Sequence, residues 1–225
     1  MSEKRSEYVI VVPQKAVRAA KTRLSSVLSR EAKAELTLMM LRRTLEVCRE
    51  LEDAAGMFVC GPEEVADLAA EYGAEMMPGG TEGLRRDMTL AAEDWRIAGR
   101  AAMLIVSSDL PLLTVEELRR VVEAWRECAD VVLCPDRRGR GTNVMMVNAP
   151  ECFPFAFGSV VGPGSFEIHK AQAEGTGLRA EVIRSEALEL DIDLPEDLAH
   201  FIHLAPDDPI ARYAKSRFQE DFRFE

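Results

Sequence analysis

The sequence has none of the long apolar segments that mark membrane or secreted proteins. Its apolar runs stay well below the ~20 residues that a helix needs to cross a bilayer. The apolar run after the charged N-terminus is also too short for the hydrophobic region of a signal peptide. We therefore expect a cytoplasmic protein without a membrane partner.

Several short motifs that identify large protein classes are also absent. The chain contains no G-x-G-x-x-G, no G-x-x-x-x-G-K-[ST] and no G-x-S-x-G. Their absence argues against dinucleotide oxidoreductases, P-loop enzymes and α/β-hydrolases. The five cysteines are scattered without a C-x-x-C pair, and the three histidines show no metal-ligand spacing with them. This pattern favours buried free thiols over a disulfide framework or a zinc site.

Positive charge is scarce, because 28 Lys and Arg stand against 39 Asp and Glu, for a net charge of −11. Such a surface repels nucleic acid, so we expect no nucleic-acid partner. The stretch 15–23 is an exception, because it carries four cations and no acid directly after an apolar run. A charge run is usually a solvated face, but in an acidic protein this position favours a pocket for an anion. The four cations are Lys15, Arg18, Lys21 and Arg23.

Short apolar runs alternate with helical patterns along the chain. The pattern predicts strands over 8–12, 56–60, 74–78, 101–109, 129–135, 141–150 and 178–185. It predicts helices over 31–51, 62–73, 83–99, 114–128 and 194–205, and a loop that leads into a helix over 162–175. This alternation implies right-handed βαβ units, and continuously apolar strands are typical of a sheet covered on both faces. The sequence therefore predicts a single α/β domain, a three-layer sandwich with a mostly parallel, mixed sheet.

Three aspartates fall where predicted strands end. Asp109 follows one apolar strand, while Asp191 and Asp193 stand two residues apart in a predicted short strand over 187–193. On an extended segment, residues two apart point to the same face. Carboxylates that close repel unless a cation separates them or one is protonated, and Mg²⁺ prefers such ligands. Turn and cap chemistry is the alternative, but we favour a metal site because ligands bind outside the carboxyl ends of parallel strands.

Two glycine-containing loops are further candidates for anion binding. Gly162 and Ser165 stand at a predicted helix N-terminus, where free amides and the helix dipole favour an anion. A plain N-cap role for Ser165 is equally consistent with the pattern. His169 lies about one turn further on the same face, where a structural histidine is the alternative. Thr142 follows the basic, glycine-containing loop RRGRG, which is either a lid over phosphate or a surface turn.

Five segments, in this order, resemble one enzyme family: VVPQKAVRAAKTRLSSVLSR, SSDLPLLT, RGTNVMMV, GPGSFEIHKAQAEG and DIDLPEDL. They are similar to the phospholactate/phosphoenolpyruvate guanylyltransferases of deazaflavin coenzyme (factor 420) biosynthesis, over about residues 8–200. The resemblance implies a Rossmann-like nucleotidyltransferase fold over residues 1–205, followed by a C-terminal tail over 206–225. It also implies transfer of GMP from GTP to a small phosphorylated carboxylic acid, with release of pyrophosphate.

The resemblance implies roles for individual residues as well. The residues implied to hold Mg²⁺ are Asp109, Asp191 and Asp193. Those implied to bind the nucleotide are Pro13, Lys15, Lys21, Arg23, Gly83, Arg85 and Ser108. Those implied to bind the small acid are Lys15, Thr142, Gly162, Ser165 and His169. Among these, catalysis by charge neutralisation is expected of Lys21, Arg23 and Asp109.

The chain departs from the family pattern at three places. Arg85 stands where the family has the asparagine of Gly-Leu-Asn, and Leu194 stands where it has threonine after the aspartate pair. The loop over 153–166 is slightly longer, so phosphoenolpyruvate, 2-phospho-L-lactate and 3-phosphoglycerate all stay open as acceptors. One alternative is a molybdopterin or sugar-phosphate nucleotidyltransferase, against which the missing glycine-rich first loop of those enzymes speaks. A non-catalytic nucleotide-binding regulatory protein is another, motivated by Arg85, and a homodimer is left open.

Overall fold

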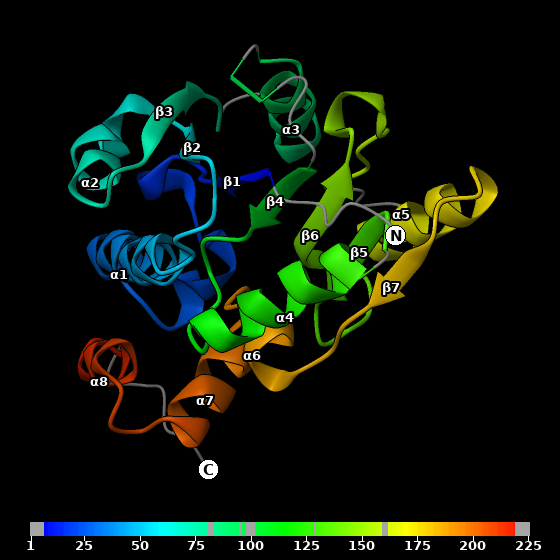
Figure 1. Ribbon diagram of the computed structural model, residues 1–225. Coiled ribbons are helices and arrows are strands. Elements are labelled where there is room, and N and C mark those ends of the chain that lie inside the picture. Colours follow the sequence, from blue (N-terminus) through cyan, green and yellow to red (C-terminus); the bar gives the residue numbers. More distant parts are fainter. Residues whose placement is uncertain are drawn as a thin grey trace.

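A seven-stranded sheet forms the middle layer of the computed structural model, which describes residues 7–80, 83–94, 96, 97, 102–127, 129–158 and 162–218 (Figure 1). Its strands are β1 (Tyr8–Pro13), β2 (Met57–Gly61), β3 (Glu75–Pro78), β4 (Ala102–Val106), β5 (Val131–Pro135), β6 (Thr142–Asn148) and β7 (Ala180–Val182). Their order across the sheet is β3-β2-β1-β4-β6-β5-β7. Neighbouring strands are parallel except at β6, which is antiparallel to both β4 and β5. The prediction of a mostly parallel, mixed sheet is confirmed.

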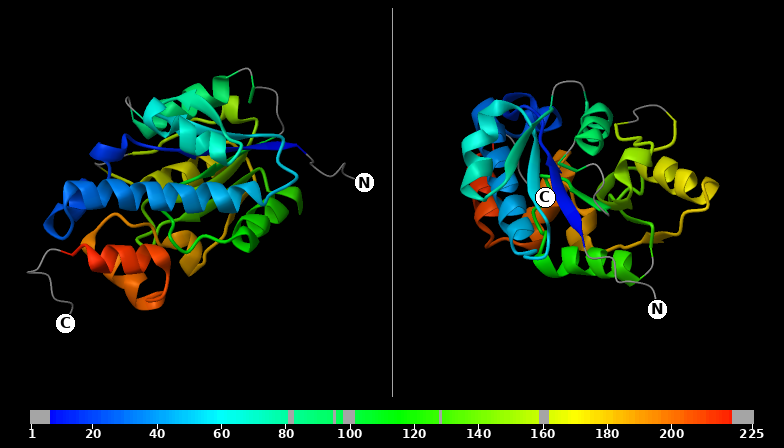
Figure 2. Two further views of the ribbon diagram at one scale, coloured as in Figure 1. Left: turned by 90° about the vertical axis from the view of Figure 1, so that its left-hand side faces the viewer. Right: turned by 45° about the horizontal axis from the view of Figure 1, so that its top comes forward.

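Helices cover both faces of this sheet (Figures 1 and 2). They are α1 (Arg30–Arg49), α2 (Ala66–Glu71), α3 (Leu84–Glu93), α4 (Val115–Glu127), α5 (Ser165–Gly175), α6 (Glu186–Glu189), α7 (Pro195–Leu204) and α8 (Pro209–Ser216). The 3₁₀ turns are η1 (Val17–Ala19), η2 (Thr22–Ser26), η3 (Glu63–Val65) and η4 (Pro150–Cys152). In the part of the chain that the structure describes, no helix is both long and apolar enough to span a membrane.

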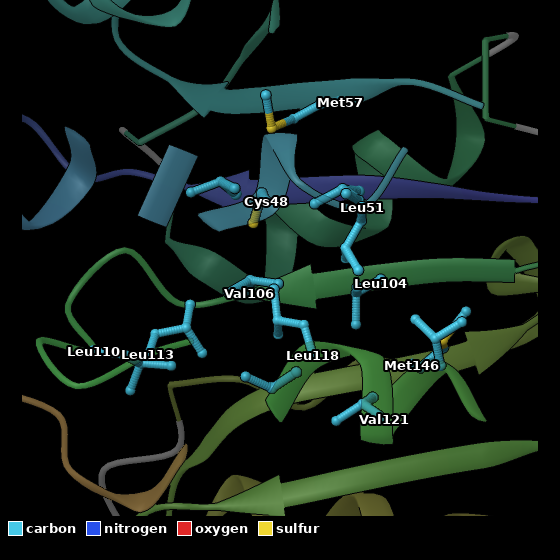
Figure 3. Packing of buried hydrophobic residues seen from close by; sticks show 14 of the residues in the cluster. Cys48, Leu51, Met57, Leu104, Val106, Leu110, Leu113, Leu118, Val121 and Met146 are labelled. Carbon is cyan, nitrogen blue, oxygen red and sulfur yellow. The ribbon is translucent and has the colours of Figure 1, made fainter. Parts of the chain in front are cut away.

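Alternate residues of the strands feed two separate cores, because successive side chains of a strand point to opposite faces. Ile10 of β1 packs in a cluster with apolar residues of α1, α2 and α4, whereas its neighbour Val11 packs with residues of α3 and α5. Figure 3 shows part of the first core, where Val106 of β4 lies near Leu118 of α4. The three-layer α/β sandwich is therefore confirmed.

A third apolar cluster joins the C-terminal helices to α1. Helix α8 lies beside α1 and α7 (Figure 2), and its residues Ile210, Ala211 and Ala214 are buried against residues of α1, η2 and α7. The start of α8 is fixed by Asp208, whose side chain accepts the Ile210 N–H at 2.8 Å and pairs with Arg43 at 2.7 Å. The segment expected as a C-terminal tail thus contains a helix packed on the body of the protein, and residues 219–225 lie outside the described chain.

The prediction of a strand over 187–193 is wrong. Residues 186–189 form the short helix α6, whose N-cap Ser185 accepts the Leu188 N–H through its hydroxyl. Leu188, Leu190 and Ile192 are all buried, so the spacing of two that suggested a strand comes from a helical turn followed by an irregular segment. Other predicted elements are shorter than expected: β7 covers three residues, and the helix over 62–73 divides into η3 and α2.

The thiols that the structure describes are free. Cys48, Cys60 and Cys134 are buried, as predicted, whereas Cys152 is exposed and Cys128 lies outside the described residues. Burial raises the pKa of Cys48 and of Cys60 to about 12, so both thiols stay protonated at neutral pH and behave as small apolar groups.

The packing of α8 predicts that this helix contributes to the stability of the whole domain. Ile210→Ala removes a side chain that is 3% exposed and should lower the free energy of unfolding by about 2–5 kcal/mol. Urea denaturation followed by circular dichroism measures this loss. Lys215→Ala, at an exposed position of the same helix, is the matched control; equal effects of the two substitutions would show that α8 is not part of the cooperative unit.

Candidate active site

Loops from both halves of the sheet meet at one edge. The chain leaves β1 toward η1 and η2 there, leaves β3 toward α3, and leaves β4 toward α4. Because β6 is antiparallel to β4, it begins at this same edge, where the Ser107 N–H donates to the Asn143 carbonyl at 2.9 Å. Many of the predicted site residues come from these loops and from the segment that follows α6, whereas Gly162, Ser165 and His169 come from α5 and the loop before it.

The structure brings Asp109, Asp191 and Asp193 together. One carboxylate oxygen from each lies within 4.8 Å of the others, and all three side chains are half-buried. The Ile192 N–H donates to the Asp109 carbonyl at 3.2 Å, which joins the two segments directly. Asn143 adds a second connection, because its side-chain amide donates to the Leu188 carbonyl at 3.0 Å.

The aspartate pair is also held from the α7 side. Asp197, which is 1% exposed, accepts the N–H groups of Asp193 and Leu194 at 3.3 and 2.8 Å. Its second oxygen accepts a 2.8 Å hydrogen bond from Arg138. The carboxylate therefore makes the half of a capping box in which the third helical residue accepts the N–H of the N-cap residue, and it fixes the backbone that carries Asp193.

Lys21 places its ammonium group within this acidic cluster. Its Nζ lies 2.5 Å from Asp109 Oδ2 and 3.4 Å from Asp193 Oδ1, and its side chain is 6% exposed. The Lys21 backbone has a φ of 53°, in the left-handed region that residues other than glycine seldom adopt. Such strain is often found at functional sites. Arg23, 64% exposed, lies at the rim, 3.6 Å from Asp193.

The charges of the cluster shift its pKa values in opposite directions. Burial, followed by the charges of Asp109 and Asp193, raises the pKa of Asp191 to about 7. Burial acts the same way on Asp193, but the Lys21 charge and hydrogen bond outweigh it and lower the pKa. Burial opposes the charge of Lys21 too, yet Asp109 and Asp193 raise its pKa above the ordinary value. The resulting Lys21–Asp193 pair stays charged at neutral pH.

One carboxylate oxygen of Asp191 is free to accept a hydrogen bond or to bind a cation, as far as the described residues show. Its Oδ1 is buried and, among the described residues, has no hydrogen-bond partner. A buried oxygen of this kind is costly unless a donor or a cation satisfies it. Three carboxylates with oxygens this close are also the hard ligands that divalent cations prefer. The residues present therefore fit a divalent metal ion.

A cavity of about 250 Å³ opens beside the acidic cluster. The predicted residues that line it are Pro13, Lys15, Lys21, Gly83, Ser108, Asp109 and Asp193. Sequence reasoning missed further lining residues, which are Gln14, Ala20, Thr37, Met40, Gly80, Leu84, Asp87 and Ser107. Arg85 does not line the cavity in the described structure but lies exposed on α3. Asp87, one half-turn later on the same helix, is buried and lines the cavity.

A second group of predicted residues lies where β6 meets α5. The Thr142 and Ser165 hydroxyls are 3.3 Å apart, and both residues are buried. His169 is fully buried behind them and accepts the Ala156 N–H at Nε2, at 2.9 Å. Because Nε2 accepts, the ring proton is on Nδ1 and is donated to the Thr142 hydroxyl, 3.1 Å away. His169 thus influences the Thr142 and Ser165 hydroxyls through its hydrogen bond to Thr142.

Glycines shape the backbone around these hydroxyls. Gly162 has a φ of 85°, and its carbonyl accepts a 3.0 Å hydrogen bond from the Arg140 side chain. Gly164 lies so close to Arg140 that an added Cβ would fall 2.1 Å from the Arg140 carbonyl oxygen. The approach of the two loops therefore requires glycine at position 164.

Comparison with known proteins places the chain among guanylyltransferases. The family described as "Guanylyl transferase CofC like" matches residues 8–219. Phosphoenolpyruvate guanylyltransferase of Chloroflexus aggregans is 32% identical over 197 residues, which cover 85% of this chain and 95% of the relative. The 2-phospho-L-lactate guanylyltransferase of Methanopyrus kandleri is 34% identical over 79% of this chain and 82% of its own. The 3-phospho-D-glycerate guanylyltransferase of Colwellia psychrerythraea is 31% identical over 84% of each.

Solved structures show the same fold at low sequence identity. A putative nucleotide-diphospho-sugar transferase from Desulfovibrio desulfuricans superposes with a TM-score of 0.77 at 16% identity, covering 93% of this chain and 94% of that one. A CMP:2-keto-3-deoxy-manno-octonic acid synthetase in complex with CTP gives a TM-score of 0.58 at 10% identity, covering 89% and 99%. The predicted nucleotidyltransferase fold is confirmed.

The burial of His169 predicts a pH dependence of stability. Burial lowers its pKa to about 4, below the ~6.5 of an unfolded histidine, so the neutral ring stabilises the fold above pH ~6.5. This stabilisation disappears as the pH falls from about 6.5 toward 4 and amounts to about 3 kcal/mol. Over that interval wild type should lose more unfolding free energy, measured by urea denaturation, than His169→Gln. His203→Gln, on the exposed side of α7, is the control; parallel pH profiles of wild type and His169→Gln would contradict the assignment.

Proposed function

The chain belongs to the CofC-like guanylyltransferase family, and from this premise we propose that it transfers GMP from GTP to a phosphorylated three-carbon carboxylic acid. The relatives named above act on phosphoenolpyruvate, 2-phospho-L-lactate or 3-phospho-D-glycerate, which are the candidate acceptors. Pyrophosphate is the second product, and the reaction belongs to deazaflavin coenzyme biosynthesis. The observation that carries the proposal is the cluster of three carboxylates and Lys21 beside a cavity in a chain of this family.

The reaction needs no side-chain nucleophile. A phosphate monoester has a second pKa near 6 and is mostly a dianion at pH 7, so the acceptor phosphate itself attacks the α-phosphate of GTP. The obstacle is repulsion between two anions. Lys21 and Arg23 lie where they offset this charge, and Lys15 adds a third cation at the cavity.

Mg²⁺ is the divalent ion that we assign to Asp109, Asp191 and Asp193. The unpartnered Asp191 oxygen and the three hard ligands support this assignment. When bound, Mg²⁺ neutralises charge on phosphoryl oxygens and orients them. Burial and the charges of Asp109 and Asp193 raise the pKa of Asp191 to about 7, and a bound cation would favour its ionised form.

The small acid is assigned to the second group of residues. Thr142 Oγ1 already accepts the His169 Nδ1–H, so the Thr142 proton is left to donate to an anionic oxygen. Ser165 opens α5, an eleven-residue helix whose dipole favours an anion near its N-terminus. Gly162 lies in the adjoining loop, held by Arg140. Together these groups support recognition of a phosphorylated carboxylate.

The alternatives have less support. The relatives that are about a third identical are named guanylyltransferases of small phosphoacids, whereas the likeness to a putative nucleotide-sugar transferase extends to the fold only. The hypothesis of a non-catalytic regulatory protein depends on Arg85. This side chain is exposed and is not part of the cavity lining, so its presence leaves the acidic cluster intact.

Asp191→Asn tests the metal assignment and the activity together. Loss of a preorganised electrostatic contact costs on the order of 10²–10³-fold in turnover. We expect this decrease in pyrophosphate release from GTP and Mg²⁺ with the preferred acid among phosphoenolpyruvate, 2-phospho-L-lactate and 3-phosphoglycerate. A thermal-shift titration with MgCl₂ should raise the Tm of wild type and not that of the variant, because ligand binding to the native state stabilises it.

Asp207→Asn changes an exposed carboxylate between α7 and α8 and serves as the control, with wild-type turnover expected. Absence of pyrophosphate release by wild type with all three acids would refute the proposed reaction. Wild-type turnover by Asp191→Asn would remove this residue from the metal site.

A further inference from the structure

The cavity is lined by two chemically different groups of residues. The first group, Lys21, Asp109 and Asp193, lies where phosphates are expected. The second group, which we call the second end, consists of Gln14, Gly80, Leu84 and Asp87 and offers an apolar surface, backbone groups and two side-chain acceptors. Under the proposed function this second end receives the base of GTP, for which the family comparison assigns no residue.

Gln14 carries an unused acceptor at this end. The residue is 3% exposed, and its Nε2 donates to the Lys15 carbonyl at 2.7 Å. This hydrogen bond decides the orientation of the amide, so the atom left over is the oxygen. Among the described residues, Gln14 Oε1 is a buried atom without a hydrogen-bond partner. A ligand that donates hydrogen bonds would satisfy it.

Asp87 provides the second acceptor. It is 5% exposed, and its Oδ2 accepts the Gly80 N–H at 3.0 Å. No other hydrogen bond to its carboxylate is found in the described chain, which leaves Oδ1 to accept from a ligand.

Gly80 connects the two acceptors. A Cβ at Gly80 would lie 2.7 Å from the Gln14 carbonyl oxygen, so the loop after β3 packs directly on the loop after β1. The same glycine donates its N–H to Asp87. Gln14 and Asp87 are therefore held in one wall of the cavity by a contact that only glycine allows.

We propose that Gln14 and Asp87 read the base of the nucleotide and select guanine, an inference that rests on the proposed GTP-dependent function. Guanine presents two adjacent donors, N1–H and the N2 amino group, which match a pair of acceptors. Adenine presents a lone pair at N1 instead, which would face the acceptors and leave buried oxygens unsatisfied. Arg85 is exposed on α3 and is not among the residues that line the cavity, so we assign it no part in this recognition.

The choice among bases can be reversed by one substitution. Asp87→Asn keeps an oxygen for the Gly80 N–H and replaces the other acceptor by an NH₂ donor. Xanthine carries a carbonyl at C2 where guanine has its amino group, so the variant should prefer xanthosine triphosphate. We expect the KM for GTP to rise about tenfold to a hundredfold with little change in kcat, and the XTP:GTP ratio of kcat/KM to rise by at least tenfold. A residue that merely caps the loop after β3 would not produce this switch.

Further variants and nucleotides test each acceptor. Gln14→Met removes, at similar length, the amide oxygen that would face N1–H. It should therefore weaken binding of GTP and of inosine triphosphate by similar factors, because inosine triphosphate lacks only the N2 amino group and keeps N1–H. Glu93→Gln makes the same carboxylate-to-amide change as Asp87→Asn at an exposed position of α3 and should leave the nucleotide preference unchanged.

Binding and transfer are measured separately so that the two proposals can fail independently. Calorimetry with GTP, ITP, XTP and ATP in MgCl₂ reports base selectivity, and pyrophosphate release reports transfer. Selective GTP binding without transfer would refute the function and leave the base assignment standing. Transfer with an unchanged XTP:GTP ratio in Asp87→Asn, or equal binding of ATP and GTP by wild type, would overturn the base assignment.

Discussion

Repulsion among three carboxylates is the constraint on which the rest of the site depends. Oxygens of Asp109, Asp191 and Asp193 lie within 4.8 Å of one another, a separation at which like charges disfavour ionisation. The protein keeps them together through the main-chain hydrogen bond from Ile192 to Asp109 and offsets part of their charge with the buried Lys21. Asp191 lacks such compensation, because its pKa is raised and its Oδ1 has no hydrogen-bond partner in the described part of the chain.

The position of Asp193 depends on a residue outside the acidic cluster. Asp197 accepts the N–H groups of Asp193 and Leu194, which precede α7, and pairs with Arg138, so one buried carboxylate fixes both the turn into the helix and the aspartate before it. Burying this carboxylate costs desolvation, which its hydrogen bonds and the cation offset. Leu194, which stands where the family has threonine, has no side-chain acceptor for the first N–H groups of α7, but Asp197 still holds the backbone that enters the helix.

Local sequence patterns predicted the strands and helices, whose formation depends mainly on the spacing of apolar residues along the chain. The continuously apolar strands and the amphipathic helices between them predicted the sandwich, and the position of Asp109 after β4 predicted that it would face the aspartate pair. The strand over 187–193 failed because burial of every second residue has the same pattern in a helical turn followed by an irregular segment. Gln14 and Asp87 could not be found from sequence, because their burial arises from the packing of Gly80 on the loop after β1, a tertiary contact.

The direction of β6 explains how one sheet edge can serve two substrates. In an all-parallel sheet the edge that binds ligands receives only the carboxyl ends of strands, and the loop before a strand lies at the opposite edge. Because β6 runs against β4 and β5, its first residue, Thr142, lies at the edge where β1 and β4 end. The loop before β6 then meets the start of α5 through the Arg140 carbonyl, which accepts the Phe166 N–H at 3.0 Å. Reversal of one strand thus places the proposed acid-binding residues at the same edge as the acidic cluster and the nucleotide cavity, as joining two anions requires.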